Sequence, residues 1–419
     1  MHMKSRFIFL ALVGLICNCA FAYNFSAVCE SGQTLYYNII SNTSPYTVSL
    51  TSENVPDTYT SDLVGDLIIP STVTNGSRTY SVTSIGWGAF SGCSGLESVV
   101  IGASITSIGW NAFYSCRGLT SVNIPNSVTS IADGAFAYCS QLSSITIGDS
   151  VTSIGHSSFE YTAWYNDHPD GILYLGNWCM GYKGDAPSGP IVIDGNTKGI
   201  VNSAFSYCEN ITSITFPDSI KYIGYEAFYN CTGLTGALVI PNAITYIKSS
   251  TFSGCSNLTS LTIGSSVSTI EASFVECYKI DSISVLALNP PTIYSYSFEF
   301  DSISDIPLTV PCGRMSVYSN AEYWNNFTNM YENNDCVGIV ENEIADLQVY
   351  PNPAGNILNI TSSETISEIE IVNAMGQVVL RKEINAENAV CDVEGLANGI
   401  YVVRIQVQGS EIQRKFVKE

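Results

Sequence analysis

A phenylalanine recurs at almost constant spacing through the middle of the chain. It stands at Phe90, Phe113, Phe136, Phe159, Phe205, Phe228, Phe252, Phe274 and Phe298. The successive intervals are 23, 23, 23, 46, 23, 24, 22 and 24 residues. Such a period predicts a solenoid, because each repeat unit buries its apolar side chains only against the units before and after it. Since 46 is twice the period, we expect residues 163–197 to hold one additional, elaborated coil.

Each repeat unit contains two short segments of alternating hydrophobicity on either side of a Pro or Gly. In one unit these segments are "LTSVNI" (119–124) and "SVTSI" (127–131). Alternation that is rich in β-branched residues predicts strands, with Leu, Val and Ile facing the interior. A third segment, "G-x-x-A-F-x-x-C", places its Ala, Phe and Cys on one face of a tight helical turn. Each coil is therefore expected to run strand, corner, strand, turn, and the fold is expected to be mainly β.

These units resemble the BspA-like class of leucine-rich repeats, whose recurring unit is "L-x-x-L-x-I-P-x-S-V-T-x-I-G-x-x-A-F-x-x-C". The resemblance covers residues 62–310, which we divide into about ten coils. The sequence departs from the common leucine-rich pattern at the corner, where it carries Pro or Gly in place of Asn. The resemblance implies a right-handed leucine-rich-repeat solenoid of parallel strands and short helical turns. It also implies display at a cell surface, often with an adhesive role.

Seven cysteines follow the recurring Phe by three residues. They are Cys93, Cys116, Cys139, Cys208, Cys231, Cys255 and Cys277. Export favours disulfides, but side chains in register on stacked coils point the same way, which strains a bridge between them. A single row of thiols without His cannot surround a metal ion tetrahedrally, so we expect no metal site. The pattern favours buried, reduced thiols that pack as small apolar side chains, and disulfides are the alternative.

Residues 1–22 have the pattern of a secretory signal peptide. Two basic residues precede the apolar run "FIFLALVGLI", which is followed by "AFA". We expect cleavage between Ala22 and Tyr23. Lipid attachment at Cys17 or Cys19 is the alternative, although neither residue follows a small one. No later stretch has the length of a membrane span, so we expect a secreted protein with no transmembrane segment in its mature chain.

The charge of the chain limits its partners. Sixteen Lys and Arg against 37 Asp and Glu give a formal net charge of −21. Such a surface repels phosphate backbones, so we expect no nucleic acid partner. Only 13% of residues are charged, so most of the polar surface consists of Ser, Thr, Asn and Tyr. This composition suits an extracellular protein that contacts sugars or other proteins.

The segments on either side of the repeats are predicted to cap the two ends of the solenoid. Residues 23–61 alternate in hydrophobicity between Gly, Ser and Asn positions, which predicts an N-terminal β capping region that shields the first coil. Residues 311–344 form the expected C-terminal cap and linker, with Trp324 and Phe327 closing the last coil. Cys312 and Cys336 lie in this part, and the sequence leaves open whether they pair.

Residues 345–419 lack the period and form a separate predicted domain. Alternating segments with turns at 373–376 and 398–399 predict a small β-sandwich. Their order resembles the type A sorting domain of the type IX secretion system. Its hallmarks fall on Pro351, Asn352, Pro353, Gly376, Gly399, Tyr401, Lys415 and Lys418. The resemblance implies export by the outer-membrane secretion machinery of a Gram-negative bacterium, with removal of the domain and display at the cell surface or release. An immunoglobulin-like binding module is the alternative.

Catalytic chemistry has little support in the sequence. After the signal peptide only His156 and His168 remain, so a Ser-His-Asp arrangement has few options, and we expect no catalytic residues and no cofactor. We expect His156 to be a solvated surface residue. His168 lies in the turn-rich "YNDHPDG", where a structural role, weak metal binding with Asp167 and Asp170, or no role remain open.

Aromatic residues around the turn make better candidates for a binding site. Trp87, Trp110 and Tyr225 precede the recurring Phe by three residues, and Tyr114, Tyr138, Tyr161, Tyr207 and Tyr229 follow it by one or two. Because the Phe faces inward, several of these rings are expected along one edge, where Tyr and Trp stack on sugars or anchor a protein. Equally, they could pack between coils and seal the edge. A row of outward Ser and Thr on the first strands, beginning at Ser98, permits the same two interpretations.

These observations favour adhesion to a host or matrix protein or to a glycan through a rigid extended face. A structural surface-layer component and a polysaccharide-capture protein are the alternatives.

Overall fold

The computed structural model describes residues 23–53, 63–298, 303–333, 347–373, 377–407 and 410–419. The predicted signal peptide with Ala22, and also Cys336 and Gly376, lie outside the described residues. The chain forms two compact units, one of residues up to 283 with 291–306 and one of residues 284–290 with 307–419. The fold is mainly β, with a solenoid of about eleven turns and a curled antiparallel sheet at the C-terminal end, which confirms the predicted fold class.

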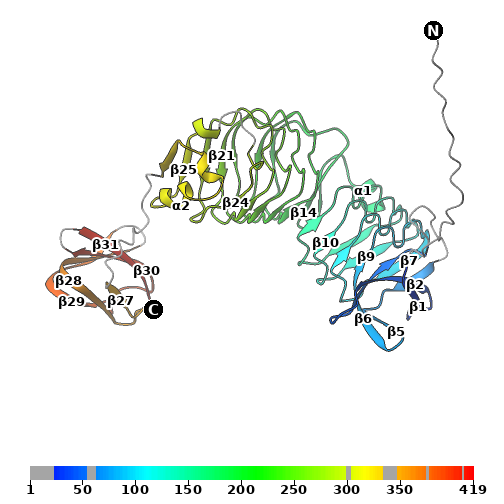
Figure 1. Cartoon of the computed structure of the whole chain (residues 1–419), viewed down its shortest axis with the longest axis horizontal. Coiled ribbons are helices and arrows are strands. Elements are labelled where there is room, and N and C mark those ends of the chain that lie inside the picture. The colour runs from blue at the N-terminus through cyan, green and yellow to red at the C-terminus, as the bar shows by residue number, and fades with distance from the viewer. Residues whose placement is uncertain (1–22, 54–62, 299–302, 334–346, 374–376, 408–409) are drawn as a thin grey trace, which may run out of the picture. The chain divides into compact units, whose positions relative to one another are not determined.

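An antiparallel meander precedes the regular coils. Its strands are β1 (Phe25–Val28), β2 (Thr34–Ser41) and β3 (Thr47–Thr51). β3 pairs in parallel with β6 (Arg78–Ile85), which forms a hairpin with β5 (Thr72–Asn75). β6 then pairs in parallel with β8 (Ser107–Ile108) of the next coil. Figure 1 shows β1, β2, β5 and β6 together at the blue end of the chain. The meander therefore covers the strand edge that the first coil would otherwise leave open.

Each regular coil contributes one strand to each of two faces. The first strands are β4 (Val64–Ile68), β7 (Gly95–Val100), β9 (Ser121–Ile124), β11 (Ser144–Ile147), β15 (Gly189–Val192), β17 (Ile211–Thr215), β19 (Gly236–Val239), β21 (Leu258–Ile263) and β23 (Ser282–Val285). The second strands are β8 (Ser107–Ile108), β10 (Ser130–Ile131), β12 (Ser153–Ile154), β16 (Gly199–Ile200), β18 (Tyr222–Ile223), β20 (Tyr246–Ile247), β22 (Thr269–Ile270) and β24 (Thr292–Ile293).

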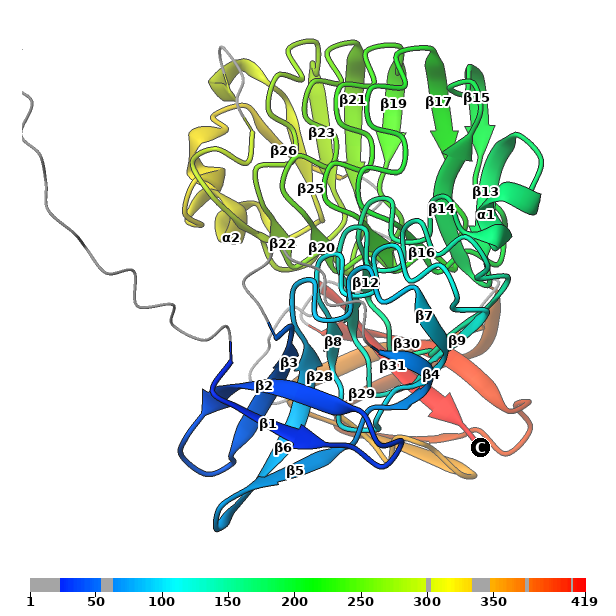
Figure 2. The same ribbon diagram turned by 90° about the vertical axis from the view of Figure 1, so that its right-hand side faces the viewer.

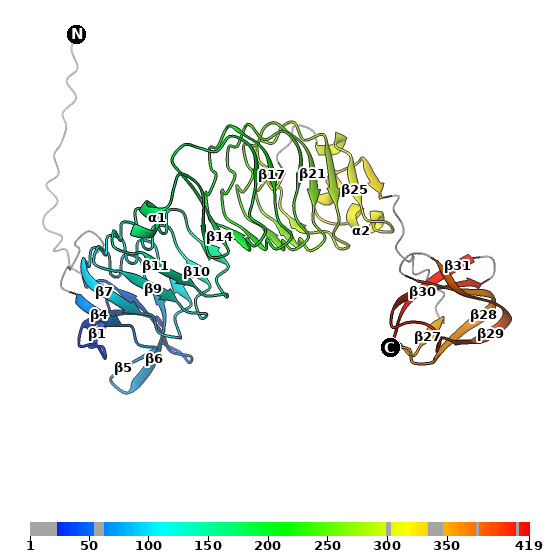
Figure 3. The same ribbon diagram turned by 180° about the vertical axis from the view of Figure 1, so that it is seen from behind.

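Neighbouring coils pair in parallel and in register. Ile131 of β10, for example, faces both Ile108 and Ile154. Figure 2 shows β15, β17, β19 and β21 side by side along one face, and Figure 3 shows the same arrangement for β7, β9 and β11. Identical residues are stacked in this way because the 23-residue period places the same side chain at the same point of each coil.

The recurring Phe side chains form a column inside the solenoid. Phe113, Phe136, Phe205, Phe228, Phe252 and Phe274 are completely buried. Neighbouring rings stack with centroids 5.0 to 5.6 Å apart and planes within 18° of parallel. Burial of large rings and their mutual stacking both stabilise the column.

The seven cysteines of the repeat are reduced and buried beside this column, which confirms the prediction. Five of them donate to the carbonyl oxygen of the Phe one coil earlier. Cys139 Sγ, for example, lies 3.0 Å from Phe113 O. Burial raises the pKa of Cys231 and of Cys277 to about 12. These thiols therefore stay protonated and unreactive near neutral pH.

The 46-residue interval contains a helix and a hairpin. These elements are α1 (Ala163–Asp167), β13 (Gly171–Leu175) and β14 (Trp178–Lys183). Thr162 replaces the cysteine of its coil, and its Oγ1 accepts a hydrogen bond of 3.1 Å from the Tyr165 N–H at the start of α1. β14 pairs in parallel with β16, and Tyr182 stacks on Phe205 at 6.4 Å. Tyr182 thus takes the place of the missing Phe in the column.

Past the last regular coil, a short 3₁₀ turn, η1 (Ile303–Asp305), ends the first unit. The second unit begins with β25 (Leu308–Val310), α2 (Met315–Ser319), η2 (Trp324–Asn326) and β26 (Met330–Glu332). Tyr318, Trp324 and Phe327 are buried together, with ring centroids 5.4 and 5.7 Å apart. Cys312 is disulfide-bonded, and Cys336, the other cysteine of this segment, lies outside the described residues.

The C-terminal part is one curled antiparallel sheet. Its strands are β27 (Gln348–Tyr350), β28 (Ile357–Val372), β29 (Val378–Asp392), β30 (Gly399–Val407) and β31 (Ser410–Lys418), in the order β27-β28-β30-β31 with β29 against β28. The first half of β28 pairs with β27 and the second half with β30, so the long strand takes part in both ends of the sheet. The sheet curls around its own apolar side chains, where the sequence predicted two packed layers.

Candidate functional site

The turn that follows the second strand is not a helix, because in seven coils two of its residues have a left-handed backbone. One stands two residues before the recurring Phe and the other two residues after it. The first position holds Gly88, Asn111, Gly134, Ser157, Ser203, Glu226 and Ser250, and the second holds Gly92, Ser115, Tyr138, Tyr161, Tyr207, Asn230, Gly254 and Glu276. The helical turn expected from the sequence is replaced by overlapping tight turns, such as the 3.0 Å bond from Tyr114 N–H to Asn111 O.

Three tyrosines occupy the second left-handed position. Tyr138, Tyr161 and Tyr207 have φ of 60°, 57° and 61°, where other coils carry Gly92 and Gly254. This conformation costs an L-residue about 1–2 kcal/mol, whereas glycine adopts it readily. The three tyrosines are nevertheless 41%, 47% and 61% exposed, so burial of their rings does not explain them. Strained residues of this kind cluster at functional sites.

The eight aromatic residues singled out in the sequence lie along the turns, and we call them the aromatic strip. They are Trp87, Trp110, Tyr114, Tyr138, Tyr161, Tyr207, Tyr225 and Tyr229. Six are exposed, and Tyr114 and Tyr229 are half-buried. The rings also contact each other from coil to coil, with Tyr138 stacked on Tyr161 at 4.5 Å and packed against Tyr114 at 5.1 Å. The strip therefore combines contacts between coils with open ring surface.

Two adjoining hollows lie along the strip. The smaller, of about 310 Å³, is lined by Trp110, Tyr138 and the side chains around them. The larger, of about 480 Å³, lies between Tyr161 and Tyr207, where the irregular coil interrupts the stacking of turns. Both include Glu160 in their walls.

The outward side chains of the first strands pair with one another along the solenoid. Ser98 Oγ donates to the Asp66 carboxylate, and Thr146 Oγ1 donates to Asn123 Oδ1 at 2.6 Å. Hydrogen bonds between coils account for part of this row of small polar residues, which agrees with a role in packing between coils.

The two histidines have different surroundings. His156 is exposed, as expected, and its backbone N–H donates to Asp133 Oδ1 at 2.8 Å. His168 packs on Trp164 with ring centroids 4.7 Å apart, and its Nδ1 lies 2.6 Å from Trp164 O. His168 thus contacts the end of α1. Within the described part of the chain, no group of three or more His, Cys, Asp or Glu is arranged to hold a metal ion.

The sorting-motif residues converge on the last strand of the C-terminal sheet. The Asn352 side chain accepts from the Val417 N–H at 3.0 Å and donates to Lys415 O at 3.3 Å. Ala354, two residues later, continues this contact, because its N–H donates to Val417 O at 2.7 Å. These hydrogen bonds hold the Pro351-Asn352-Pro353 segment against β31, which lies about 65 positions later in the chain.

The remaining described motif residues lie in the same region. Gly399 is opposite Lys418 at the start of β30, and Tyr401 is opposite Phe416, on which its ring stacks at 5.7 Å. Tyr401 Oη donates to Ala397 O at 2.8 Å and so closes the preceding turn. Lys418 is buried. Motifs that are far apart in the sequence therefore form one surface at the edge of the sheet.

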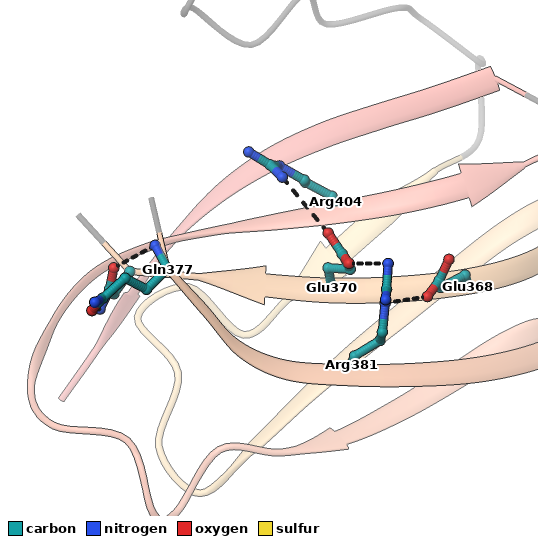
Figure 4. A network of polar contacts seen from close by, with 6 residues as sticks. Glu368, Glu370, Gln377, Arg381 and Arg404 are labelled. Atoms are coloured by element: carbon teal, nitrogen blue, oxygen red, sulfur yellow. Dashed lines mark hydrogen bonds and ion pairs between the residues drawn. The ribbon is translucent and has the colours of Figure 1, made fainter. Parts of the chain in front are cut away.

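A charged network crosses the middle of this sheet (Figure 4). Arg381 of β29 contacts Glu368 and Glu370 of β28, each at 2.6 Å, and Arg404 of β30 lies 3.6 Å from the other oxygen of Glu370. Gln377 and Asn373 bond to each other across the adjoining turn. Cross-strand pairs of opposite charge hold neighbouring strands in register.

The repeats and the C-terminal sheet match known families. Residues 71–177 and 190–324 match the family described as BspA type leucine rich repeat region, in six copies. These ranges cover more than half of the 419 residues. The chain belongs to the BspA-type leucine-rich repeat family. Residues 348–419 match the secretion system C-terminal sorting domain, so this is a secreted leucine-rich repeat protein with a sorting domain.

Curated relatives match only short stretches of this BspA-type protein. Beta-agarase D of Zobellia galactanivorans is 39% identical over 72 residues, 17% of this chain and 14% of that protein. Beta-agarase A of the same organism is 35% identical over 66 residues, 15% of this chain and 12% of that protein. The chain therefore matches about a seventh or less of the length of either relative.

Two of the solved structures that match the chain come from bacteria. A leucine-rich repeat protein from Bacteroides ovatus is 22% identical, with a TM-score of 0.30 and coverage of 66% of this chain and 71% of that one. A leucine rich cell surface protein from Faecalibacterium prausnitzii is 22% identical, with a TM-score of 0.29 and coverage of 69% and 89%.

Sequence reasoning found the BspA-type repeat but missed the left-handed positions. A signal for them was present, since Gly92, Asn230 and Gly254 occupy the same position as the strained tyrosines. Gly and Asn at an equivalent turn position indicate a left-handed backbone. The Glu370 network was also missed, because its strand pairings depend on the curled sheet.

Proposed function

We propose that the solenoid of this secreted leucine-rich repeat protein binds an extracellular protein or glycan through the aromatic strip. Exposed Tyr and Trp rings stack on sugars and anchor protein partners. Since the rings repeat from coil to coil, an extended ligand can contact several at once, and linked contacts raise the overall affinity. The proposed role is adhesion by a rigid face, and no chemical step is part of it.

The observation that carries this proposal is the left-handed backbone of Tyr138, Tyr161 and Tyr207. Other coils complete the same turn with Gly92, Ser115 or Gly254, so the turn itself does not require an aromatic ring at this position. A bulky ring that is exposed at a strained backbone position indicates a role other than stabilising the fold.

The test uses the full chain on an array of extracellular matrix proteins and glycans. The variant replaces Tyr138, Tyr161 and Tyr207 by glycine, which removes three rings and relieves their backbone strain. The matched control replaces Ser115 and Glu276 by glycine, at the same position of other coils. We expect the tyrosine variant to lose binding at least tenfold with an intact fold, and the control to bind normally.

Two results would contradict the proposal. Equal binding by the tyrosine variant and the wild type would place the ligand elsewhere on the protein. Absence of any bound protein or glycan, together with ordered self-assembly of the chain, would instead support a structural surface-layer component.

For the C-terminal sheet, the matched sorting domain implies handling by the type IX secretion system, with secretion and surface display in Bacteroidetes. We further propose that the machinery recognises the edge formed by Asn352 and Lys415, which are both exposed, and that the sheet is removed after export. Among the described residues, no helix is long and apolar enough to span a membrane. Removal of residues 345–419 is expected to keep the protein inside the cell, and unchanged surface display would refute the sorting role.

A further inference from the structure

The larger hollow of the aromatic strip lies where the regular stack of turns is interrupted. Tyr161 forms one wall and Tyr207 the other, and these two residues stand at equivalent positions of coils separated by the hairpin β13-β14. Tyr165 of α1 and Tyr182 of β14 add two further rings to the lining, which also includes His156. The hollow of about 480 Å³ is large enough for an amino-acid side chain to enter between four aromatic rings.

The rings of Tyr165 and Tyr182, which line this hollow, are neutral. Burial is the main cause that raises the pKa of both Tyr165 and Tyr182, so their phenols stay protonated at physiological pH. A cation already lies over one of the four rings, because Lys183 Nζ is 5.4 Å from the centroid of Tyr165. The electron-rich face of a tyrosine ring attracts ammonium and guanidinium groups in this way.

Two carboxylates share the hollow with these rings. Glu160 and Glu226 are both half-buried and stand in its wall. Of the described residues that line it, none is Lys or Arg. Glu226 also has a left-handed backbone, with φ of 55°, at a position where Gly88 and Gly134 stand in other coils. Tyr161, Tyr207 and Glu226 thus all have a strained, left-handed backbone at the same hollow.

We propose that this hollow receives a cationic side chain, arginine or lysine, from a basic segment of an extracellular protein partner. The proposal rests on the proposed binding function and specifies its ligand. Carboxylates pair with guanidinium or ammonium groups while the rings cover the apolar stem of the same side chain. The net charge of −21 attracts basic segments from a distance. A neutral glycan would use the rings but leave both carboxylates without a counter-charge, and an acidic glycan would be repelled.

The experiment titrates the full chain with hexa-arginine, hexa-lysine, a Gly-Ser hexapeptide and a neutral oligosaccharide, at 150 and 500 mM salt. The variant Glu160→Gln with Glu226→Gln removes both charges and keeps the shape of the wall. Its control, Glu97→Gln with Glu322→Gln, removes two exposed charges that are not among the residues lining the hollow. A second variant, Ser206→Lys, places a competing cation in the lining itself.

We expect the basic peptides to bind the wild type and the control alike, and the Glu160/Glu226 variant about tenfold or more weakly at 150 mM salt. Ser206→Lys is expected to weaken binding similarly, which keeps the test valid if the double variant does not fold. Equal losses in variant and control would mean diffuse charge attraction and would overturn the inference. Binding of the neutral oligosaccharide alone would also overturn it.

The inference and the proposed function fail separately. If the tyrosine-to-glycine variant loses its array ligand while the Glu160/Glu226 variant keeps it, the strip is a binding site but its ligand is not cationic. If neither variant loses binding, both proposals are wrong.

Discussion

Tyr138 offers a direct measurement of the backbone strain in the aromatic strip. Replacing it by alanine or by glycine removes the same ring and the same contacts with Tyr114 and Tyr161, at 5.1 and 4.5 Å. Each aromatic pair contributes about 0.5–1.5 kcal/mol beyond its buried area. The alanine variant is therefore expected to lower the free energy of unfolding by about 1–3 kcal/mol.

The two variants then differ only in their backbone. At a φ of 60°, glycine avoids the left-handed cost of about 1–2 kcal/mol that alanine retains. Glycine also loses roughly 0.5–1 kcal/mol more backbone entropy on folding. The balance makes Tyr138→Gly about 0.5–1 kcal/mol more stable than Tyr138→Ala, the reverse of the usual order.

Tyr114 is the matched control, because it stands in the same kind of turn, one residue after its Phe, without a positive φ. There the usual order holds, and Tyr114→Ala is expected to be about 0.5–1 kcal/mol more stable than Tyr114→Gly. Urea unfolding followed by far-UV circular dichroism measures both pairs, with the slope checked because stacked repeats can unfold in parts. If alanine is the more stable residue at both positions, the left-handed strain assigned to the strip is wrong.

Four further predictions concern the core, the thiols and the sorting edge. Phe136→Ala should lower the free energy of unfolding by about 3–5 kcal/mol, because Phe136 is fully buried between Phe113 and Phe159; an unchanged melting temperature would contradict this packing. Alkylation of Cys231 and Cys277 at pH 8, followed by mass spectrometry, should be at least about 100-fold slower in the native protein than in denaturant, whereas equal rates would mean accessible thiolates. The pKa of both thiols is about 12 in the folded protein and about 8.5 in the unfolded chain. The folded state therefore retains more protons above pH 8.5, and the free energy of unfolding should fall as the pH rises from about 8.5 towards 12. A free energy of unfolding that does not change over this pH range would count against burial of the thiols. Asn352→Ala should reduce the surface-displayed fraction, measured by immunoblotting of cell fractions, while Asn388→Ala, at an exposed position of β29, should not; equal display of the two variants would mean that Asn352 has no role in sorting.

The repeat itself was predictable because its contacts are between neighbouring coils. A side chain such as Phe136 meets only the same residue of the coils above and below, so its spacing in the sequence indicates its surroundings in the fold. The same reasoning identified the buried thiols, since Cys139 occupies an equivalent inward position in each coil. Burial in a uniform stack requires no knowledge of long-range pairing.

The C-terminal sheet was predictable in its strands but not in its arrangement. Alternation indicated strands, and the motif resemblance placed Asn352 and Lys418 in one domain. The contact of Asn352 with the backbone of Val417 depends on which strands pair, and alternation does not specify this. The same holds for Arg381 and Glu370, which face each other only because β28 and β29 adopt one register.

Sequence by itself determined the period, the inward column of rings and thiols, and the line of aromatic residues beside it. Each of these follows from spacing alone, because a stacked coil repeats its environment. Tertiary structure alone decided that Tyr138, Tyr161 and Tyr207 stand on strained backbone, and that Glu160 and Glu226 face one hollow where the hairpin interrupts the stack. Such features arise where the repetition is broken, and there the position of a residue depends on contacts with parts of the chain that its own period does not describe.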